Sequence, residues 1–317
     1  MSSSPVAANR RSFLFGAAGT ASLLGLSACG VNAESEGGDD VETRKIETDN
    51  GTVAVPVDPQ RVIAVENWTA YMLVDLGVVP IGIADGTLNE AVVPPDVYEQ
   101  LKGAITIGAM GEPNAQAIGV LEPDLIIDQF YTEQSAPLST IAPVVFYHWL
   151  GDIPWDEQID RIADAVNRPD ALSQAKEDYA QRIEAIKAAY AEQLESKVWG
   201  IVSGGPNGTY YLGSPLATVL RSLGATLISA LPEDEVGFLE KSYEELDLLE
   251  ECDVIVHPVM FDGSYPAPTQ ELLDNAVWKG LGVVASGNAH PFAHYSVGTY
   301  RWANGALDEI EAILKGL

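Results

Sequence analysis

Short apolar runs recur along the chain, at intervals that leave room for a helix between them. The runs are rich in Val and Ile and are bounded by Gly, Pro or Asp, which is the composition of buried strands. Strands are predicted at 61–65, 79–83, 124–127, 144–147, 198–202 and 253–256. Because such strands alternate with helical stretches, the pattern predicts an α/β fold with mostly parallel sheets.

Local signals add a hairpin and several helices to this pattern. The turn Asp49-Asn50-Gly51 separates the runs 45–48 and 52–55, and Asn-Gly tolerates the positive φ that tight hairpin turns require. Helices are predicted at 69–76, which ends in Gly77, at 216–223, and at 304–314.

One segment differs from the rest because its apolar residues follow a helical period over a much greater length. Its apolar face consists of Leu172, Ala175, Tyr179, Ile183, Ile186, Tyr190 and Leu194. Pro169 suits a first helical turn, and the helix should extend for about 35–40 Å at 1.5 Å per residue. We therefore expect two α/β lobes, at 44–155 and 197–317, joined by a connecting helix within 156–196.

The N-terminal segment has the features of an export signal. Residues 1–28 contain no acidic residue, and Arg10-Arg11 precede an apolar stretch that is too short for a membrane span. The arginine pair is similar to a twin-arginine signal, and Leu26-Ser27-Ala28-Cys29 is similar to a bacterial lipobox. The prediction is cleavage before Cys29 and a lipid on its thiol; the alternative is a plain secretory signal.

The residues after Cys29 extend this prediction to the location of the protein. Residues 29–43 are polar, acidic and rich in Gly, which predicts a flexible tether. We expect the protein at the extracytoplasmic face of the cell membrane, attached only through the lipid on Cys29.

Composition narrows the classes of partner. The chain of 317 residues has 46 Asp and Glu against 17 Lys and Arg, a formal net charge of −29, which argues against nucleic acid as a partner. Apolar residues make up 47% of the chain, enough to build a core. The two cysteines, Cys29 and Cys252, do not suggest a disulfide framework, and Cys252 is expected in the core.

Motifs of common enzyme classes are missing from the sequence. It contains no Gly-x-Ser-x-Gly, no His-Glu-x-x-His, no phosphate-binding loop and no dinucleotide fingerprint. We therefore expect a binding protein, with a secreted hydrolase as the alternative from a different class.

Several short sequence motifs, in their order along the chain, resemble those of one protein family. They are the stretch from Thr52 to Gly77, Ile107-Gly108 with Asn114, and the segments 121–127, 141–145, 244–256, 275–278 and 282–284. Together with the long helix, they resemble the cluster III, helical-backbone solute-binding proteins of ABC importers. That family captures ferric siderophores, haem and cobalamin.

The resemblance implies a function and a set of partners. It implies a monomer without a cofactor that holds a ferric siderophore in a cleft between its lobes and delivers it to a permease with its ATPase. Members often present one Glu on each lobe to the permease, and in lobe two Glu244 or Glu245 matches. In lobe one the matching position is Gln116, so Glu112 is the substitute.

The candidate ligand-binding residues follow the carboxyl ends of the predicted strands, where open α/β lobes bind ligands. Aromatic residues gather there, and Trp and Tyr offer both an apolar surface and a polar atom. The aromatic candidates are Trp68, Tyr131, Trp149, Tyr210, Tyr211, Phe261, Tyr300 and Trp302. Trp199 and Trp278 are assigned instead to the core.

Few cations accompany these aromatic residues. Arg301 and Lys241 are the candidates, with the Arg301 guanidinium donating to chelating oxygens. Since a trianionic catecholate chelate needs several cations, a ferric hydroxamate or a mixed-type chelate fits better.

Histidines keep a haem receptor of the same fold open as an alternative, ahead of cobalamin. His148 and His257 follow strands of different lobes, so His148 with Tyr210, Tyr211 or His257 could supply axial ligands. Direct metal binding is not expected, because the four histidines are scattered.

Overall fold

Two separate sheets carry the fold. The computed structural model describes residues 42–130, 136–148, 153–234 and 237–317. The first sheet is entirely parallel. Its three inner strands are buried on both faces, as is typical of parallel sheets, and the edge strand at 105–106 is exposed. In spatial order its strands are β5 (Ile105–Thr106), β4 (Gly82–Ile83), β3 (Val62–Ala64), β8 (Leu125–Asp128) and β9 (Val144–Phe146).

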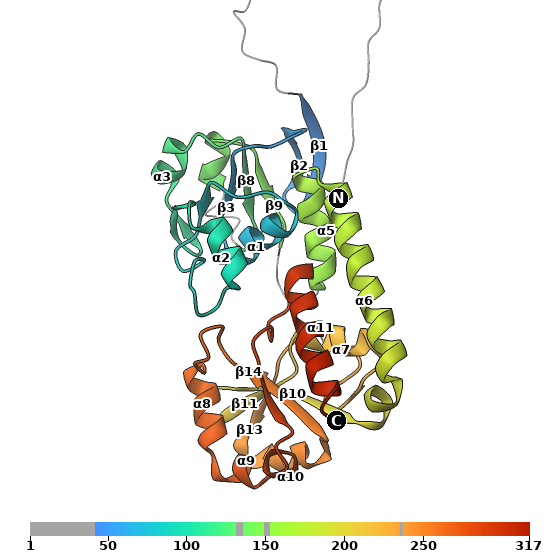
Figure 1. The fold of residues 1–317 in the computed structure, drawn as a ribbon. Helices are drawn as coiled ribbons and strands as arrows, with labels where there is room; N and C mark the ends of the chain where they lie inside the picture. Colours follow the sequence, from blue (N-terminus) through green and yellow to red (C-terminus); the bar gives the residue numbers. More distant parts are fainter. Residues whose placement is uncertain (1–41, 131–135, 149–152, 235–236) are drawn as a thin grey trace, which may run out of the picture. The chain divides into compact units, whose positions relative to one another are not determined.

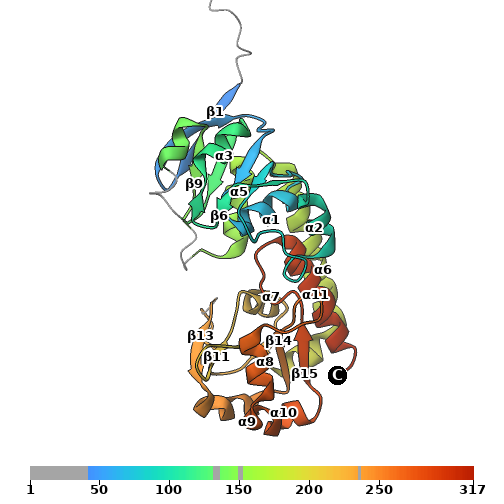
Figure 2. The same cartoon turned by 90° about the vertical axis from the view of Figure 1, so that its left-hand side faces the viewer.

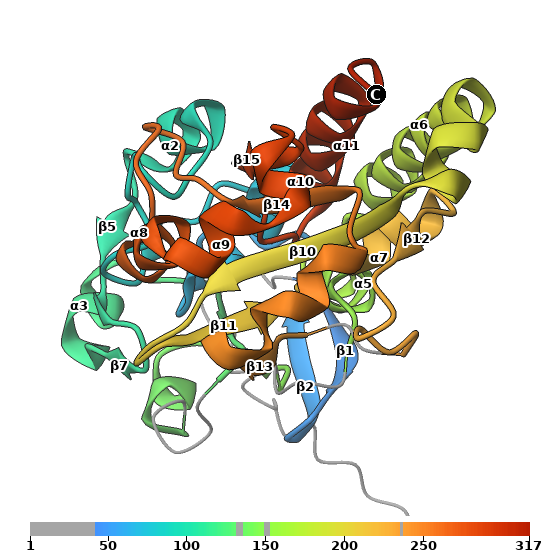
Figure 3. The ribbon, with the colours of Figure 1, turned by 90° about the horizontal axis from the view of Figure 1, so that it is seen from below.

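The second sheet is mixed (Figure 3). Its central strand β10 (Val198–Gly204) pairs in parallel with β14 and β12 and antiparallel with β11. The other strands are β11 (Thr209–Leu212), β12 (Thr226–Leu227), β13 (Leu239–Ser242), β14 (Val254–Pro258) and β15 (Ala289–Phe292). The prediction of an α/β fold with mostly parallel sheets is confirmed; the antiparallel pairs β10–β11 and β11–β13 are the exception.

Two small antiparallel pairs complete the strands. The predicted hairpin is present as β1 (Thr43–Thr48) and β2 (Gly51–Pro56), and Gly51 has a φ of 102°. The second pair is β6 (Gly108–Ala109) with β7 (Glu112–Pro113).

Helices α1 and α2 follow strands of the first sheet, α3 follows the small pair β6–β7, and a second group of helices follows strands of the second sheet (Figures 1 and 2). The first group is α1 (Asn67–Asp75), α2 (Pro95–Leu101), α3 (Ala115–Val120) and the 3₁₀ helix η1 (Ala136–Thr140). The second is α7 (Leu216–Ser222), the 3₁₀ helix η2 (Tyr243–Glu251), α8 (Ala267–Asp274), α9 (Ala276–Gly280) and α10 (Gly282–Ala285). In the described part of the chain no helix is long and apolar enough to cross a membrane.

The segment expected to form a connecting helix contains two helices, α5 (Trp155–Ala165) and α6 (Pro169–Ser196). They are separated at Asn167, which has a φ of 53°, a value that ends a helix. Helix α6 packs against the last helix, α11 (Tyr300–Leu314), and α5 packs against both α1 and α6. Residues 41–317 thus form one compact unit in which these helices link the sheets.

Candidate functional site

A cavity of about 500 Å³ lies between elements of the two sheets. It is bounded by α1, by the loop before α2, by β10 and β11, by the segments after β14 and β15, and by α11. Its lining residues are Asn67, Trp68, Tyr71, Ala91, Val92, Ser203, Gly204, Tyr211, Phe238, Pro258, Val259, Met260, Phe261, Pro266, Pro268, Thr269, Ala293, Tyr295, Ser296 and Trp302. This size and apolar lining are typical of small-molecule sites.

The cavity lining has no charge. None of the described residues that line it is Asp, Glu, Lys, Arg or His, in a chain with a formal charge of −29. The internal segments outside the described residues, 131–135, 149–152 and 235–236, contain no Lys, Arg or His in their sequence. An anionic ligand would therefore find no opposite charge among the described lining residues.

Three aromatic rings form one wall of the cavity. Trp68 and Tyr71 lie one turn apart on α1, and Trp302 comes from the first turn of α11. The Tyr71 ring stacks on Trp302 at 5.1 Å between centroids, and Trp68 meets Tyr71 edge-on at 5.4 Å and Trp302 at 5.6 Å. Since aromatic pairs favour these geometries, the rings hold one another in place.

Capping hydrogen bonds at the N-termini of α1 and α11 fix the helical turns that carry Trp68 and Trp302. The buried Glu66 carboxylate caps α1 by accepting the backbone N–H groups of Trp68, at 2.7 Å, and of Thr69. Burial raises the pKa of Glu66 to about 7, although these hydrogen bonds lower it. The nearby charge of Asp128 raises the pKa further. On the other side, Thr299 caps α11 and accepts from the Trp302 N–H at 3.3 Å.

The second sheet supplies the facing wall. Tyr211 on β11 meets the exposed ring of Phe238 edge-on at 6.1 Å. Beside them, the Phe261 N–H donates to the Ala91 carbonyl at 2.8 Å, a backbone hydrogen bond between loops that follow different sheets. This hydrogen bond thus links the two sides of the cavity through the main chain.

Polar atoms are sparse on these walls. The Tyr71 hydroxyl donates to the Thr87 carbonyl at 2.7 Å, and the Tyr295 hydroxyl to that of Gly213 at 3.4 Å. Asn67, Ser203, Tyr211, Thr269 and Ser296 add further donors and acceptors to the lining. Such a surface can enclose an apolar ligand and orient a few of its oxygens.

Four of the sequence-predicted residues meet in this cavity: Trp68, Tyr211, Phe261 and Trp302. Sequence reasoning missed Tyr71, Phe238 and Tyr295. Tyr71 carried a signal, because it lies in the helix predicted at 69–76, three residues after Trp68, and residues at this spacing share a helix face. Tyr295 lies in the loop predicted at 290–302, one of the predicted strand-end segments, but was not chosen from it. Phe238 had no signal, since it follows no predicted strand.

The structure places other predicted residues away from the cavity. Tyr210 is fully buried on the opposite face of β11 from Tyr211, and its hydroxyl donates to the Glu245 carbonyl at 3.0 Å. Tyr300 is buried between Trp155 and Tyr179.

The two predicted cations also lie outside the lining. Lys241 on β13 pairs with Glu245 at 3.6 Å. Arg301 pairs with Asp75 and Asp96. The loop expected at 290–302 already contains the start of α11, so Arg301 is a helical residue.

The histidines of the haem alternative do not line the cavity either. His257 is buried beside Tyr265 and Trp278, and burial lowers its pKa to about 4. His148 is exposed and lies edge-on to Phe146. Among the described residues, no group of three or more His, Cys, Asp or Glu could hold a metal ion.

The remaining predicted positions are on the surface or outside the described residues. Glu112, Gln116, Glu244 and Glu245 are exposed. Tyr131, Trp149 and Cys29, with the rest of the export signal and tether up to Val41, lie outside the described residues.

The predicted core residues are where the sequence placed them. Trp199 and Trp278 are buried. Cys252 is a buried free thiol whose pKa burial raises to about 12.

Comparison with known proteins decides the family. The profile of the periplasmic binding protein family matches residues 62–288, more than half of the chain. The chain belongs to the periplasmic binding protein family. As the sequence predicted, this periplasmic binding protein is a binding protein and not an enzyme.

Individual relatives cover most of its length. It is 27% identical over 313 residues to the "Probable siderophore-binding lipoprotein YfiY" of Bacillus subtilis, covering 91% of this chain and 94% of that one. It is 26% identical over 280 residues to the "Fe(3+)-citrate-binding protein YfmC" of the same organism, covering 84% of each.

A solved structure confirms the predicted fold of this periplasmic binding protein. The siderophore periplasmic binding protein from the fuscachelin gene cluster of Thermobifida fusca superimposes with a TM-score of 0.71 at 29% identity. The match covers 83% of this chain and 99% of that one.

Proposed function

We propose that this periplasmic binding protein captures a ferric siderophore outside the cytoplasmic membrane and delivers it to the permease of an ABC importer. The observation that carries the proposal is the uncharged, aromatic cavity between the two sheets. A chelate with an apolar exterior would fill such a cavity, and the sparse polar side chains would orient its oxygens. Relatives named for siderophore and ferric citrate binding support the iron-chelate class.

We further propose that the chelate is neutral or weakly charged, as expected for a ferric hydroxamate or a mixed-type complex. Ferric citrate and catecholate complexes are anions and require compensating cations, and the described cavity lining has none. Most cations of the described chain are already paired, as Arg301 is with Asp75 and Lys241 with Glu245. The net charge of −29 would also repel an anion during its approach.

The proposal includes a location and a partner. The signal in residues 1–28 would direct export, the lipid on Cys29 and the tether of residues 29–43 would hold the protein at the membrane, and Glu112 with Glu244 or Glu245 would contact the permease. In the same proposal the lobes are 44–155 and 197–317, with α5 and α6 as the link between them.

Trp fluorescence of the purified protein tests the ligand. Ferrichrome and ferrioxamine B should quench emission at sub-micromolar concentration, and ferric citrate should bind at least tenfold more weakly because it is anionic. Trp68→Ala should weaken hydroxamate binding by about 2 kcal/mol, roughly 30-fold. Trp278→Phe, which changes a buried Trp outside the cavity lining, is the matched control and should keep the wild-type affinity.

The same titration separates the alternatives. Ferric citrate binding more tightly than both hydroxamates would overturn the proposed ligand charge. A haemin complex with a shifted Soret band that disappears in His148→Ala would establish the haem alternative. Binding of no iron chelate, together with turnover of an ester or peptide, would overturn the receptor proposal altogether.

A further inference from the structure

Arg301 makes a two-carboxylate contact at the point where α11 begins. Its Nε donates to Asp75 Oδ1 at 2.9 Å, and its Nη1 contacts Asp96 Oδ2. Asp75 is the last residue of α1, and Asp96 lies in the first turn of α2, so both carboxylates come from the part of the fold that surrounds the first sheet. Arg301 therefore joins helix α11 to helices α1 and α2.

Asp75 contributes more than a charge to this contact. Its second carboxylate oxygen, Oδ2, accepts the backbone N–H of Arg301 at 2.8 Å. This N–H belongs to the first turn of α11, where backbone donors have no partner within the helix. The Asp75 side chain is only 4% exposed, against 36% for Arg301. A buried carboxylate from α1 thus satisfies the end of α11 and is itself neutralised there.

Residues close to this contact on α1 and α11 belong to the aromatic wall. Trp302 directly follows Arg301, and Tyr71 lies one helical turn before Asp75. The Tyr71–Trp302 stack therefore spans the same two helices that the Arg301–Asp75 contact holds together.

We propose that Arg301 and Asp75 are positioning residues that hold the first turn of α11 against the end of α1, so that Trp68, Tyr71 and Trp302 form a wall ready for the ligand. The inference rests on the proposed function only in taking this cavity as the ligand site. It assigns Arg301 a role through the ring of Trp302, in place of direct hydrogen bonds to the ligand.

Near-UV circular dichroism of the ligand-free protein tests the positioning directly. Arg301→Ala and Asp75→Asn should each change the aromatic signal in the same way, because each removes one half of the contact. Arg301→Lys should fall between wild type and Arg301→Ala, since an ammonium keeps the charge but not the fork of donors. Arg182→Ala is the matched control: Arg182 pairs with Asp308 on the same helix α11, away from its first turn, and should leave the signal unchanged.

Ligand affinity then distinguishes positioning from direct contact. Arg301→Ala should weaken ferrichrome and ferric citrate by the same factor, about tenfold, because the wall serves any ligand. Weakening confined to ferric citrate, with an unchanged near-UV spectrum, would show that Arg301 contacts the ligand and would overturn the inference. If the spectrum changes as expected but the wild-type protein binds no chelate, the proposed function fails and the positioning role stands.

Discussion

The Trp68 ring can take its place in the cavity wall because the residue packed against it, at position 298, is glycine. A Cβ added at Gly298 would lie 2.5 Å from Cζ3 and 3.0 Å from Cδ2 of the Trp68 ring, closer than packed atoms approach. Gly298 therefore permits the position of the Trp68 ring because it has no side chain there.

Gly298→Ala should displace the Trp68 ring and weaken chelate binding by about tenfold. Gly280→Ala is the control, because no heavy atom lies within 4 Å of its added Cβ. Chelate titrations of both variants give the measurement. Equal affinities of the two variants would show that the ring can move aside without cost.

The buried Glu66 makes stability depend on pH. Its pKa is about 7 in the folded protein and has an ordinary value of 4.5, so between these pH values the folded state binds a proton that the unfolded state has released. The free energy of unfolding should therefore fall as pH rises from 4.5 to 7, by about 3 kcal/mol from this group. Glu66→Gln, which stays neutral, should lose that dependence.

The pH dependence of wild type must be compared with that of Glu66→Gln, because His257 changes the free energy of unfolding in the opposite direction. Burial lowers its pKa to about 4 from 6.5, so its contribution to stability is present above pH 6.5 and is lost as pH falls toward 4. Denaturant unfolding of wild type and Glu66→Gln at several pH values cancels this contribution. Exposed Glu177→Gln should follow the wild-type curve, and parallel wild-type and Glu66→Gln curves would contradict the prediction.

Sequence reasoning reached part of the cavity at this scale. Trp68 and Phe261 were found because the ends of predicted strands gather near ligand sites. Tyr210 and Tyr211 were not separated, because which of two successive residues faces the cavity depends on the pairing of β11 with β10 and β13. That pairing is a long-range property that no local pattern contains.

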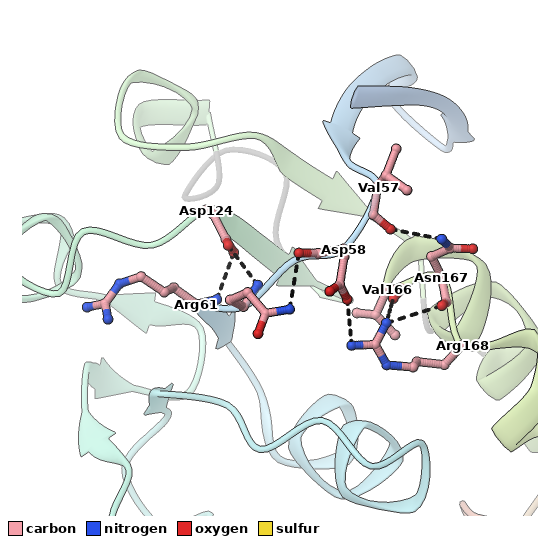
Figure 4. Close-up of polar contacts among 8 residues, drawn as sticks. Val57, Asp58, Arg61, Asp124, Val166, Asn167 and Arg168 are labelled. Carbon is pink, nitrogen blue, oxygen red and sulfur yellow. Dashed lines mark hydrogen bonds and ion pairs between the residues drawn. The ribbon is translucent and has the colours of Figure 1, made fainter. Parts of the chain in front are cut away.

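At the scale of elements, the junction between α5 and α6 is fixed to the segment between β2 and β3 (Figure 4). The Asn167 side chain donates to the Val57 carbonyl at 2.8 Å, and Arg168 pairs with Asp58 at 2.8 Å. Nearby, Asp124 accepts the Arg61 N–H at 2.9 Å. The turn that redirects the chain between the two helices is thus held by the segment leading into β3.

Two substitutions at Asn167 should separate its two contributions. Asn167→Gly keeps the left-handed backbone and loses the hydrogen bond to Val57, for a cost of about 1 kcal/mol. Asn167→Ala also has to adopt a φ of 53°, which costs roughly 1 kcal/mol more. Denaturant unfolding measures both variants, and an alanine variant as stable as the glycine variant would show that the backbone conformation is not strained.

The sequence predicted elements best where hydrophobic periodicity was long or strands were buried. Helix α6 and strands β3, β8 and β14 lie close to the predicted positions. Helix α11 was predicted to begin at Asn304 but starts at Tyr300, because the aromatic residues at its start resemble a ligand-binding loop. Its cap, Thr299, is a residue that also occurs in loops and is not diagnostic without the contacts around it.

For the whole molecule, the excess of acidic residues is the dominant electrostatic fact. Ion pairs such as Arg44–Asp164 and Lys279–Asp274 use many of the cations. Because acidic residues far outnumber basic ones, many carboxylates have no cation to pair with and repel one another. Repulsion of this kind destabilises a folded chain. It also fits a neutral cavity better than a cationic one, since most cations of the described chain are already in ion pairs.

The unfolding temperature should therefore rise with salt. Raising NaCl from 0.1 M to 1 M shortens the screening length from about 10 Å to about 3 Å and should raise the midpoint by roughly 5 °C. The rise should be smaller at pH 4.5, where part of the carboxylates are protonated. Thermal unfolding by circular dichroism measures both, and a midpoint that falls with NaCl would show that the ion pairs outweigh the repulsion.

The hydrogen bond from the Phe261 N–H to the Ala91 carbonyl makes one amide a reporter of the separation of the two loops that it joins. Since this bond joins main-chain groups, only a proline at position 261 would remove its donor, and its proton exchanges with deuterium only when the loops part. Exchange at Phe261 should slow on chelate binding, while the amide of Ile255 within the second sheet keeps its rate. The exchange rate of this amide then measures how often the two loops separate in the ligand-free protein.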